Sequence, residues 1–181
     1  MNAIATLHPY LGPIVTLAIY TGMRRGEIYE RAWGRVDFSR ETITLLKTKS
    51  GRSREIPMNS LVKQTLRQLE QGRLKGSEFV FTDEDGKPRT PRSRHWYQVC
   101  RAAGLVNLNF HDLRHTAATR MAEAGTDAFT IADILGHASI QMSARDTHAT
   151  DQGRRRAGAA ILTEREKDCH KIVTRERKQA G

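Results

Sequence analysis

A short polar segment in the second half of the chain carries two histidines and one arginine at helical spacing. His111, Arg114 and His115 stand at positions i, i+3 and i+4, so a helix places them close together on one face. The arginine offers a planar, permanently charged fork for an anionic oxygen group, and a histidine one turn away adds a donor or a proton carrier. The pattern predicts binding of a phosphate-like anion, although an ordinary solvated face has the same composition.

A metal site is the second interpretation of these histidines. Two histidines at i and i+4 form part of the zinc site on metalloprotease helices. In this chain Asp112 would stand at the general-base position of that motif, and Arg114 would lie beside the cation. A guanidinium next to a metal ion is unfavourable, so we expect no metal and no other cofactor.

The helix that carries these residues is predicted to begin near Phe110 and to end near Gly125. Its apolar residues recur every three or four positions and form one stripe that should face the core: Leu113, Ala117, Met121 and Ala124. The two histidines and the arginine are expected on the opposite face.

A second charged pair lies close to the start of the chain. The apolar segment Leu11 to Tyr20 predicts a helix that Gly22 ends, and a new helix then carries Arg24 and Glu27. Because these two residues are three positions apart, the carboxylate can hold the guanidinium in place. The alternative is a surface ion pair, which contributes little.

The rest of the pattern is helical apart from one small sheet. Trp33 to Phe38, Thr42 to Leu46 and Arg54 to Pro57 read as three short strands of an antiparallel meander. Segments 61–69, 96–103 and the stretch that ends at Leu135 have helical spacing. The predicted fold class is therefore mainly α with a small three-stranded antiparallel β-sheet.

The charge balance favours a polyanionic partner. The chain has 30 Lys and Arg residues against 20 Asp and Glu, a net charge of +10, which indicates nucleic acid first and an anionic membrane surface second. The apolar stretch Ile14 to Tyr20 is far too short to cross a bilayer. The chain does not open with a secretory segment, and Cys100 and Cys169 suggest no disulfide framework. We therefore expect a cytoplasmic protein without a membrane partner.

Four segments together resemble a known family. Thr21 to Ile28 resembles the first arginine box of the tyrosine recombinases, the phage integrase family. Three further segments follow in the family's order: a hairpin that carries Lys49, the segment from His111 to Arg114, and Leu135-Gly136-His137. The resemblance covers roughly residues 10–150 and implies the integrase, or tyrosine-recombinase, catalytic core.

The resemblance also implies partners and roles. Members bind double-stranded DNA, cleave it through a 3′-phosphotyrosyl link without a metal, and associate as tetramers on paired sites. Arg24 and Arg114 would clamp the phosphate, supported by Glu27. Lys49, with Lys47 as the near alternative, would protonate the leaving oxygen. His111 would handle the nucleophile's proton, and His137 would bond the phosphate. Further DNA contacts are expected from other basic residues: Arg25, Lys47, Arg52, Arg89, Arg92, Arg94 and His115.

The chain departs from the family at the nucleophile. The family's tyrosine lies nine residues after the histidine of the third box, and Asp146 stands there. An acyl phosphate would be a hydrolysable, high-energy link, and a carboxylate repels the scissile phosphate. We therefore expect cleavage to be defective in the chain as written. The resemblance otherwise implies a recombinase in the cytoplasm of a bacterial cell or phage-infected host.

The expected domain boundaries follow from the same resemblance. Residues 1–150 should form the catalytic domain, residues 151–181 a charged segment that is helical or disordered in part, and the family's N-terminal core-binding domain should be absent. Arg31, where an apolar residue is usual, suggests degeneration. The alternative is a non-catalytic helix-turn-helix regulator, because Met121 to Gly125 followed by Ile131 and Leu135 partly fits that motif.

Overall fold

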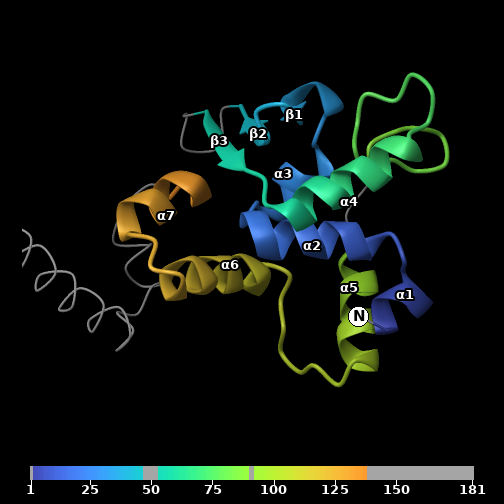
Figure 1. Ribbon diagram of the computed structural model, residues 1–181. Helices are drawn as coiled ribbons and strands as arrows, with labels where there is room; N and C mark the ends of the chain where they lie inside the picture. The colour runs from blue at the N-terminus through green and yellow to red at the C-terminus, as the bar shows by residue number, and fades with distance from the viewer. Residues whose placement is uncertain (1, 47–52, 90–91, 138–181) are drawn as a thin grey trace, which may run out of the picture.

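The computed structural model describes residues 2–46, 53–89 and 92–137 (Figure 1). The expectations for Lys47, Lys49, Arg52, Asp146 and the segment 151–181 lie outside the described residues. Seven helices, a 3-10 turn and three strands follow one another along the described chain: α1 Asn2–Leu7, α2 Leu11–Thr21, α3 Arg25–Tyr29, η1 Trp33–Arg35, β1 Val36–Asp37, β2 Thr42–Leu45, β3 Arg54–Pro57, α4 Ser60–Gln71, α5 Ser93–Ala102, α6 Asp112–Glu123 and α7 Ala128–Leu135.

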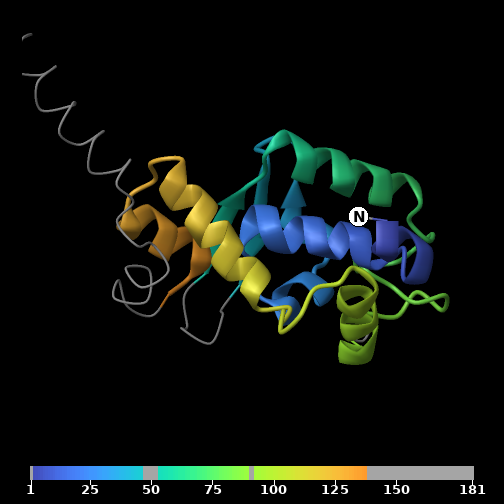
Figure 2. The ribbon, with the colours of Figure 1, turned by 90° about the horizontal axis from the view of Figure 1, so that it is seen from below.

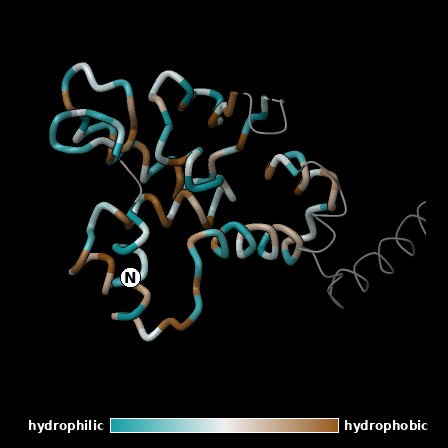
Figure 3. The backbone as a smooth tube through the Cα atoms, turned by 180° about the vertical axis from the view of Figure 1, so that it is seen from behind, coloured by the Kyte–Doolittle hydropathy of each residue, from teal (hydrophilic) through white to brown (hydrophobic). Residues whose placement is uncertain are grey.

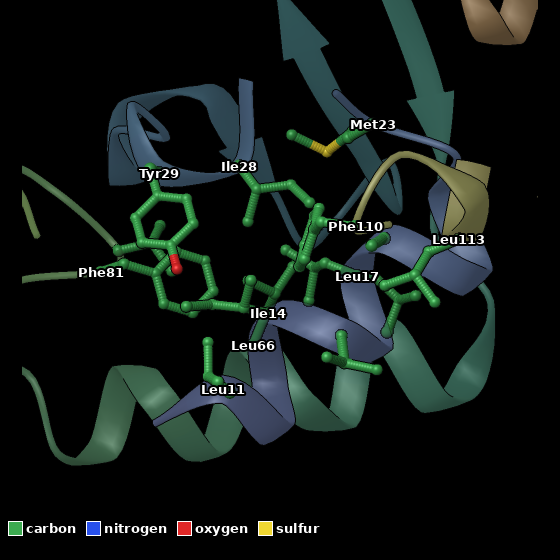
Figure 4. Close-up of a cluster of buried hydrophobic side chains, with 14 of the residues drawn as sticks. Leu11, Ile14, Leu17, Met23, Ile28, Tyr29, Leu66, Phe81, Phe110 and Leu113 are labelled. Atoms are coloured by element: carbon green, nitrogen blue, oxygen red, sulfur yellow. The ribbon is translucent and has the colours of Figure 1, made fainter. Parts of the chain in front are cut away.

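Helix α2 lies at the centre of the molecule, in contact with α4 and α6 (Figures 1 and 2). Ile14 and Leu17 are completely buried and meet Leu66 of α4, Leu113 of α6 and Phe110 in one apolar cluster (Figure 4). The helix ends at Gly22, whose φ of 65° is left-handed, a conformation that glycine adopts without steric cost. The predicted end of this helix is confirmed.

The predicted antiparallel meander is present, with strand order β1-β2-β3. Ile43 of β2 pairs with Val36 of β1 and with Ile56 of β3. The first strand is much shorter than predicted, because Trp33–Arg35 turns into a 3-10 helix. There Trp33 N donates to Glu78 O, and Arg35 N donates back to Ala32 O, so these donors are unavailable for pairing with β2.

The chain between α4 and α6 covers one end of the molecule. Figure 3 shows mostly hydrophilic residues along the outer loop between α4 and α5. Helix α5 begins three residues before the predicted position at Trp96. It packs against α1, a contact that was not predicted from the sequence. Within residues 2–46, 53–89 and 92–137, no helix has the length and apolar character to span a membrane.

Helix α6 has the predicted extent but a different buried face. Leu113 and Ala117 are buried as predicted, whereas Ala124 is exposed. The expectation that Arg114 lies on the opposite, solvated face is wrong, since only 4% of it is exposed. The physical reason is that α6 packs on α2 along one side and on α7 along another, where Ala118, Ile131 and Leu135 form a second apolar cluster.

Candidate functional site

Arg24 occupies the N-terminal cap of α3 and is held there by Glu27. The Arg24 backbone N–H donates to Glu27 Oε2 over 2.7 Å, and Arg24 Nη1 donates to Oε1 over 3.0 Å. The pair predicted from the i, i+3 spacing is therefore present. Because both oxygens of the Glu27 carboxylate accept hydrogen bonds from Arg24, the guanidinium has a fixed direction. The Arg24 side chain nevertheless stays 35% exposed.

Arg114 reaches the same place from α6. Its Nη1 donates to the Gly22 carbonyl over 2.7 Å, and its Nη2 donates to the Leu135 carbonyl over 2.5 Å. One carbonyl belongs to the residue that ends α2, and the other belongs to the last residue of α7. The guanidinium therefore ties two helix ends together.

Arg54 is a third arginine of this group, and it was not predicted from the sequence. Its side chain is only 4% exposed and forms an ion pair of 2.9 Å with Glu27 Oε2. Its Nε donates to the Ile134 carbonyl over 2.9 Å. The available signal was the alternation of β3, in which Arg54 shares the buried face with Ile56. A charged residue on the inward face of a strand requires a partner.

The three arginines converge on the C-terminal end of α7. Arg54, Arg114 and Arg24 donate to three successive carbonyls, those of Ile134, Leu135 and Gly136. The last carbonyls of a helix have no partner within the helix and carry a partial negative charge, so guanidiniums satisfy them well. We call Arg24, Arg54 and Arg114 the arginine cluster.

His137 directly follows the carbonyls that the arginine cluster binds. Gly136 has a left-handed φ of 66°, and His137 N donates to the Ala132 carbonyl over 2.9 Å. This hydrogen bond closes α7 and fixes the backbone from which the His137 side chain leaves. Of the predicted phosphate-binding residues that the structure describes, Arg24, Arg114 and His137 therefore belong to one hydrogen-bonded assembly.

His111 lies one turn before Arg114 on α6. Its ring meets the His115 ring edge-on at 5.2 Å between centroids. Partial burial lowers the pKa of His111, and the neighbouring charges of His115, Arg114 and Arg24 lower it further, while Asp112 opposes them. The imidazole therefore favours its neutral form, which accepts a proton from a nucleophile.

Glu27 is ionised in spite of its burial. Burial alone would raise the pKa of this carboxyl. The Arg24 backbone N–H and the Arg54 guanidinium donate hydrogen bonds to the charged form, and the two positive charges stabilise it further, so the pKa lies below its ordinary value. One carboxylate thus compensates two arginines and leaves the arginine cluster with an excess of positive charge.

Arg31 is built into the fold. It is 8% exposed, and its Nη1 donates to the Thr44 carbonyl of β2. Burial lowers the pKa of this guanidinium. The side chain links the end of α3 to the sheet, so the departure at Arg31 has a structural explanation other than degeneration.

The other predicted DNA contacts that the structure describes lie in more than one place. Arg25 donates to Ser93 Oγ over 3.0 Å, which places it beside Arg92 and Arg94 at the exposed start of α5. Arg89 stacks over the Tyr10 ring at 4.4 Å. His115 is exposed on α6. Among the described residues, no group of histidine, cysteine or acidic side chains is arranged to hold a metal ion.

Comparison with known proteins supplies the family. The model of the phage integrase family matches residues 1–153. The shufflon-specific DNA recombinase of Escherichia coli is 35% identical over 136 residues, which cover 75% of this chain and 34% of that protein. The chain spans about half the length of a tyrosine recombinase XerC of Bacillus pumilus that it also matches.

Two solved structures show the same fold. The Tn1549 transposon integrase in complex with circular intermediate DNA has a TM-score of 0.72 at 24% identity, covering 86% of this chain and 61% of that one. The catalytic domain of bacteriophage HP1 integrase has a TM-score of 0.65 at 25% identity, covering 87% of this chain and 86% of that domain. The mainly helical fold with its three-stranded sheet is thus that of integrase catalytic domains.

Proposed function

This chain belongs to the phage integrase family, and on that premise we propose that it binds duplex DNA and holds one phosphodiester for strand transfer of the tyrosine-recombinase type. The observation that carries the proposal is the arginine cluster. Arg24 and Arg114 come from segments far apart in sequence, yet both donate to the final carbonyls of α7, directly before His137. Two oriented guanidiniums, both close enough to His111 to lower its pKa, suit the non-bridging oxygens of a phosphate.

Each group has a role that its surroundings support. Arg24 and Arg114 stabilise the charge that builds on the phosphate, and His137 adds a hydrogen bond. His111, whose lowered pKa favours the neutral imidazole, takes the proton of the nucleophile. Lys49 is proposed to protonate the leaving 5′-oxygen, as the family resemblance implies.

The partners follow from the relatives. The Escherichia coli relative is a DNA recombinase, and the Tn1549 integrase was solved in complex with DNA. For this chain we propose double-stranded DNA as the ligand, self-association on paired sites as a tetramer, and a cytoplasmic location. Arg25, Arg92, Arg94 and the net charge of +10 support the DNA contact.

Strand cleavage requires a nucleophile, and Asp146 stands at its place. We propose that the chain as written binds DNA without cleaving it and that Asp146→Tyr restores a covalent adduct. Removing a nucleophile costs many orders of magnitude, because the other groups only stabilise charge around an attack that no longer occurs.

The test uses a nicked suicide duplex carrying the site that the protein selects from a random DNA library. Denaturing gels compare the native chain, Asp146→Tyr and Asp146→Phe, and only Asp146→Tyr should give a protease-sensitive covalent band. A band from the native chain would identify another nucleophile and refute the assignment. If Asp146→Tyr gives no band, the experiment is repeated with a relative's N-terminal domain supplied in trans, and a second failure refutes the proposal.

The helix-turn-helix alternative makes the opposite prediction. Helices α6 and α7 do pack together around a turn at Gly125, whose φ is 94°. A regulator of that kind would bind a specific sequence tightly even after Arg24→Ala or Lys49→Ala. Under our proposal both substitutions weaken DNA binding, and the affinity falls steeply with salt.

A further inference from the structure

Arg54 is a buried cation that does not face the DNA-binding surface. Its side chain is 4% exposed, compared with 35% for Arg24. Its Nε and Nη2 donate to the Ile134 carbonyl and to Glu27, and its buried Nη1 lies against Gly136, so the guanidinium is occupied by the protein itself. Keeping a guanidinium out of water has a substantial desolvation cost unless it is paired. A residue of this kind needs a role other than direct contact with DNA.

The contacts of Arg54 join the two acceptors that hold Arg24. Arg24 is fixed by Glu27 on one side and by the Gly136 carbonyl on the other, each at 3.0 Å. Arg54 donates to the same Glu27 over 2.9 Å and to the Ile134 carbonyl, two residues before Gly136, also over 2.9 Å. One rigid fork from β3 thus sets the separation between α3 and the end of α7.

The backbone at Gly136 supports this arrangement independently. A Cβ atom at this position would lie 2.6 Å from Arg54 Nη1 and 2.9 Å from its Cζ. The guanidinium therefore packs directly against the glycine whose carbonyl receives Arg24. A shift of Arg54 toward Gly136 would therefore push on the residue whose carbonyl accepts from Arg24.

We propose that Arg54 is a positioning residue, which orients Arg24 toward the phosphate by holding Glu27 and the C-terminal turn of α7 in register. Arg54 also pairs with Glu27, so the charge of this carboxylate is divided between two arginines and does not fully neutralise Arg24. The inference rests on the proposed function, since it presumes that Arg24 binds a phosphate. Arg54 itself does not touch the phosphate.

Two substitutions and one matched control test the role. Arg54→Met keeps the length of the side chain but removes its charge. Arg54→Lys keeps the charge but cannot donate to Glu27 and to the Ile134 carbonyl in one plane. Arg40→Met is the control. Arg40 pairs with Glu55, which lies on β3 like Arg54, but the Arg40 side chain is 66% exposed. Thermal unfolding first establishes that each variant is folded.

The first measurement is the ¹⁵N order parameter of the Arg24 Nε–Hε group in the chain without DNA. Arg54→Met and Arg54→Lys should both lower it toward the value of an exposed arginine, and Arg40→Met should leave it unchanged. An unchanged order parameter in a folded Arg54 variant overturns the inference. This readout does not depend on DNA, so it separates a failure of the inference from a failure of the proposed function.

The second measurement is the loss of affinity that Arg24→Ala causes for a fluorescent 30-base-pair duplex. In the native background the loss should be about tenfold, the effect of a hydrogen-bonded charge, and in the Arg54→Met background it should shrink to about twofold or less. An equal loss in both backgrounds would mean that Arg54 only stabilises the fold. No loss in the native background contradicts the proposed phosphate contact itself.

Discussion

Two groups of arginines in this protein are treated differently by the fold. In the arginine cluster, each guanidinium donates to backbone carbonyls at the end of α7, and Arg54 and Arg114 are almost completely buried. Arg25, Arg92 and Arg94 are exposed at the start of α3 and α5. Fixed cations select a geometry, whereas exposed cations attract any phosphate backbone and exchange with salt ions.

The difference also reveals how buried positive charge is tolerated. Glu27 supplies the negative charge for Arg24 and Arg54, and the carbonyls of Gly22 and Leu135 supply partial charges to Arg114. Substitutions in the arginine cluster should therefore affect stability and DNA binding together. Substitutions in the exposed group should affect DNA binding alone.

The largest effect is expected from Arg114→Met. Two buried carbonyls lose their donor, and each unpaired group costs roughly 1–3 kcal/mol, so the free energy of unfolding should fall by about 4 kcal/mol. Urea denaturation monitored by circular dichroism measures it. Arg94→Met is the control and should change the free energy by less than about 0.5 kcal/mol. Similar losses in both variants would remove the distinction between the two groups.

Gly22→Ala should disturb the contacts of Arg114 with the ends of α2 and α7, with a smaller loss in the free energy of unfolding. A Cβ at Gly22 would lie 2.2 Å from Leu135 Cδ2, in a backbone with φ +65°. Gly76 has a similar φ of +81° but open space around it, so Gly76→Ala measures backbone strain alone, about 1 kcal/mol. Gly22→Ala should cost about 1–2 kcal/mol more. Equal losses of stability for Gly22→Ala and Gly76→Ala in thermal unfolding would show that α7 moves aside for the new methyl group without cost.

Sequence patterns predicted the contacts that are local and missed those that are distant. The Arg24–Glu27 pair is visible because its residues are three apart on one helix, and the end of α2 is visible because Gly22 suits a left-handed cap. Arg54 contacts residues 27 and 134, a separation that no periodicity encodes. The burial of Arg114 was missed for a related reason, since one apolar stripe was assumed and α6 packs against both α2 and α7.

The pH dependence of stability tests the charge compensation by Glu27. Because its folded pKa lies below the ordinary value of 4.5, the ionised carboxylate stabilises the fold above that ordinary value, and the contribution is lost as the pH falls through the folded pKa. Glu27→Gln should therefore be less stable than the native chain at pH 7, and the two should converge under acid.

Denaturation midpoints measured from pH 7 down to about pH 3 give the comparison. Glu70→Gln is the control, because Glu70 forms an exposed ion pair with Arg67 on α4 and such pairs contribute little. A constant difference between Glu27→Gln and the native chain across this range would mean that the charge of Glu27 contributes nothing to the fold.

The smallest effects belong to the exposed arginines and appear only in DNA binding. Arg94→Ala should weaken the affinity for a duplex by a few-fold and reduce the slope of log K against log salt by about one, as expected when one phosphate contact is lost. Arg94→Lys should restore both, because an exposed cation acts as a point charge.

The matching change in the arginine cluster should not be rescued. Arg24→Lys keeps the charge, but an ammonium cannot reproduce the planar fork that donates to Glu27 and Gly136. Fluorescence anisotropy titrations at four salt concentrations compare the lysine and alanine variants at both positions. If lysine restores binding at Arg24 as well as at Arg94, charge alone matters at both, and the fixed geometry of the arginine cluster contributes nothing to DNA binding.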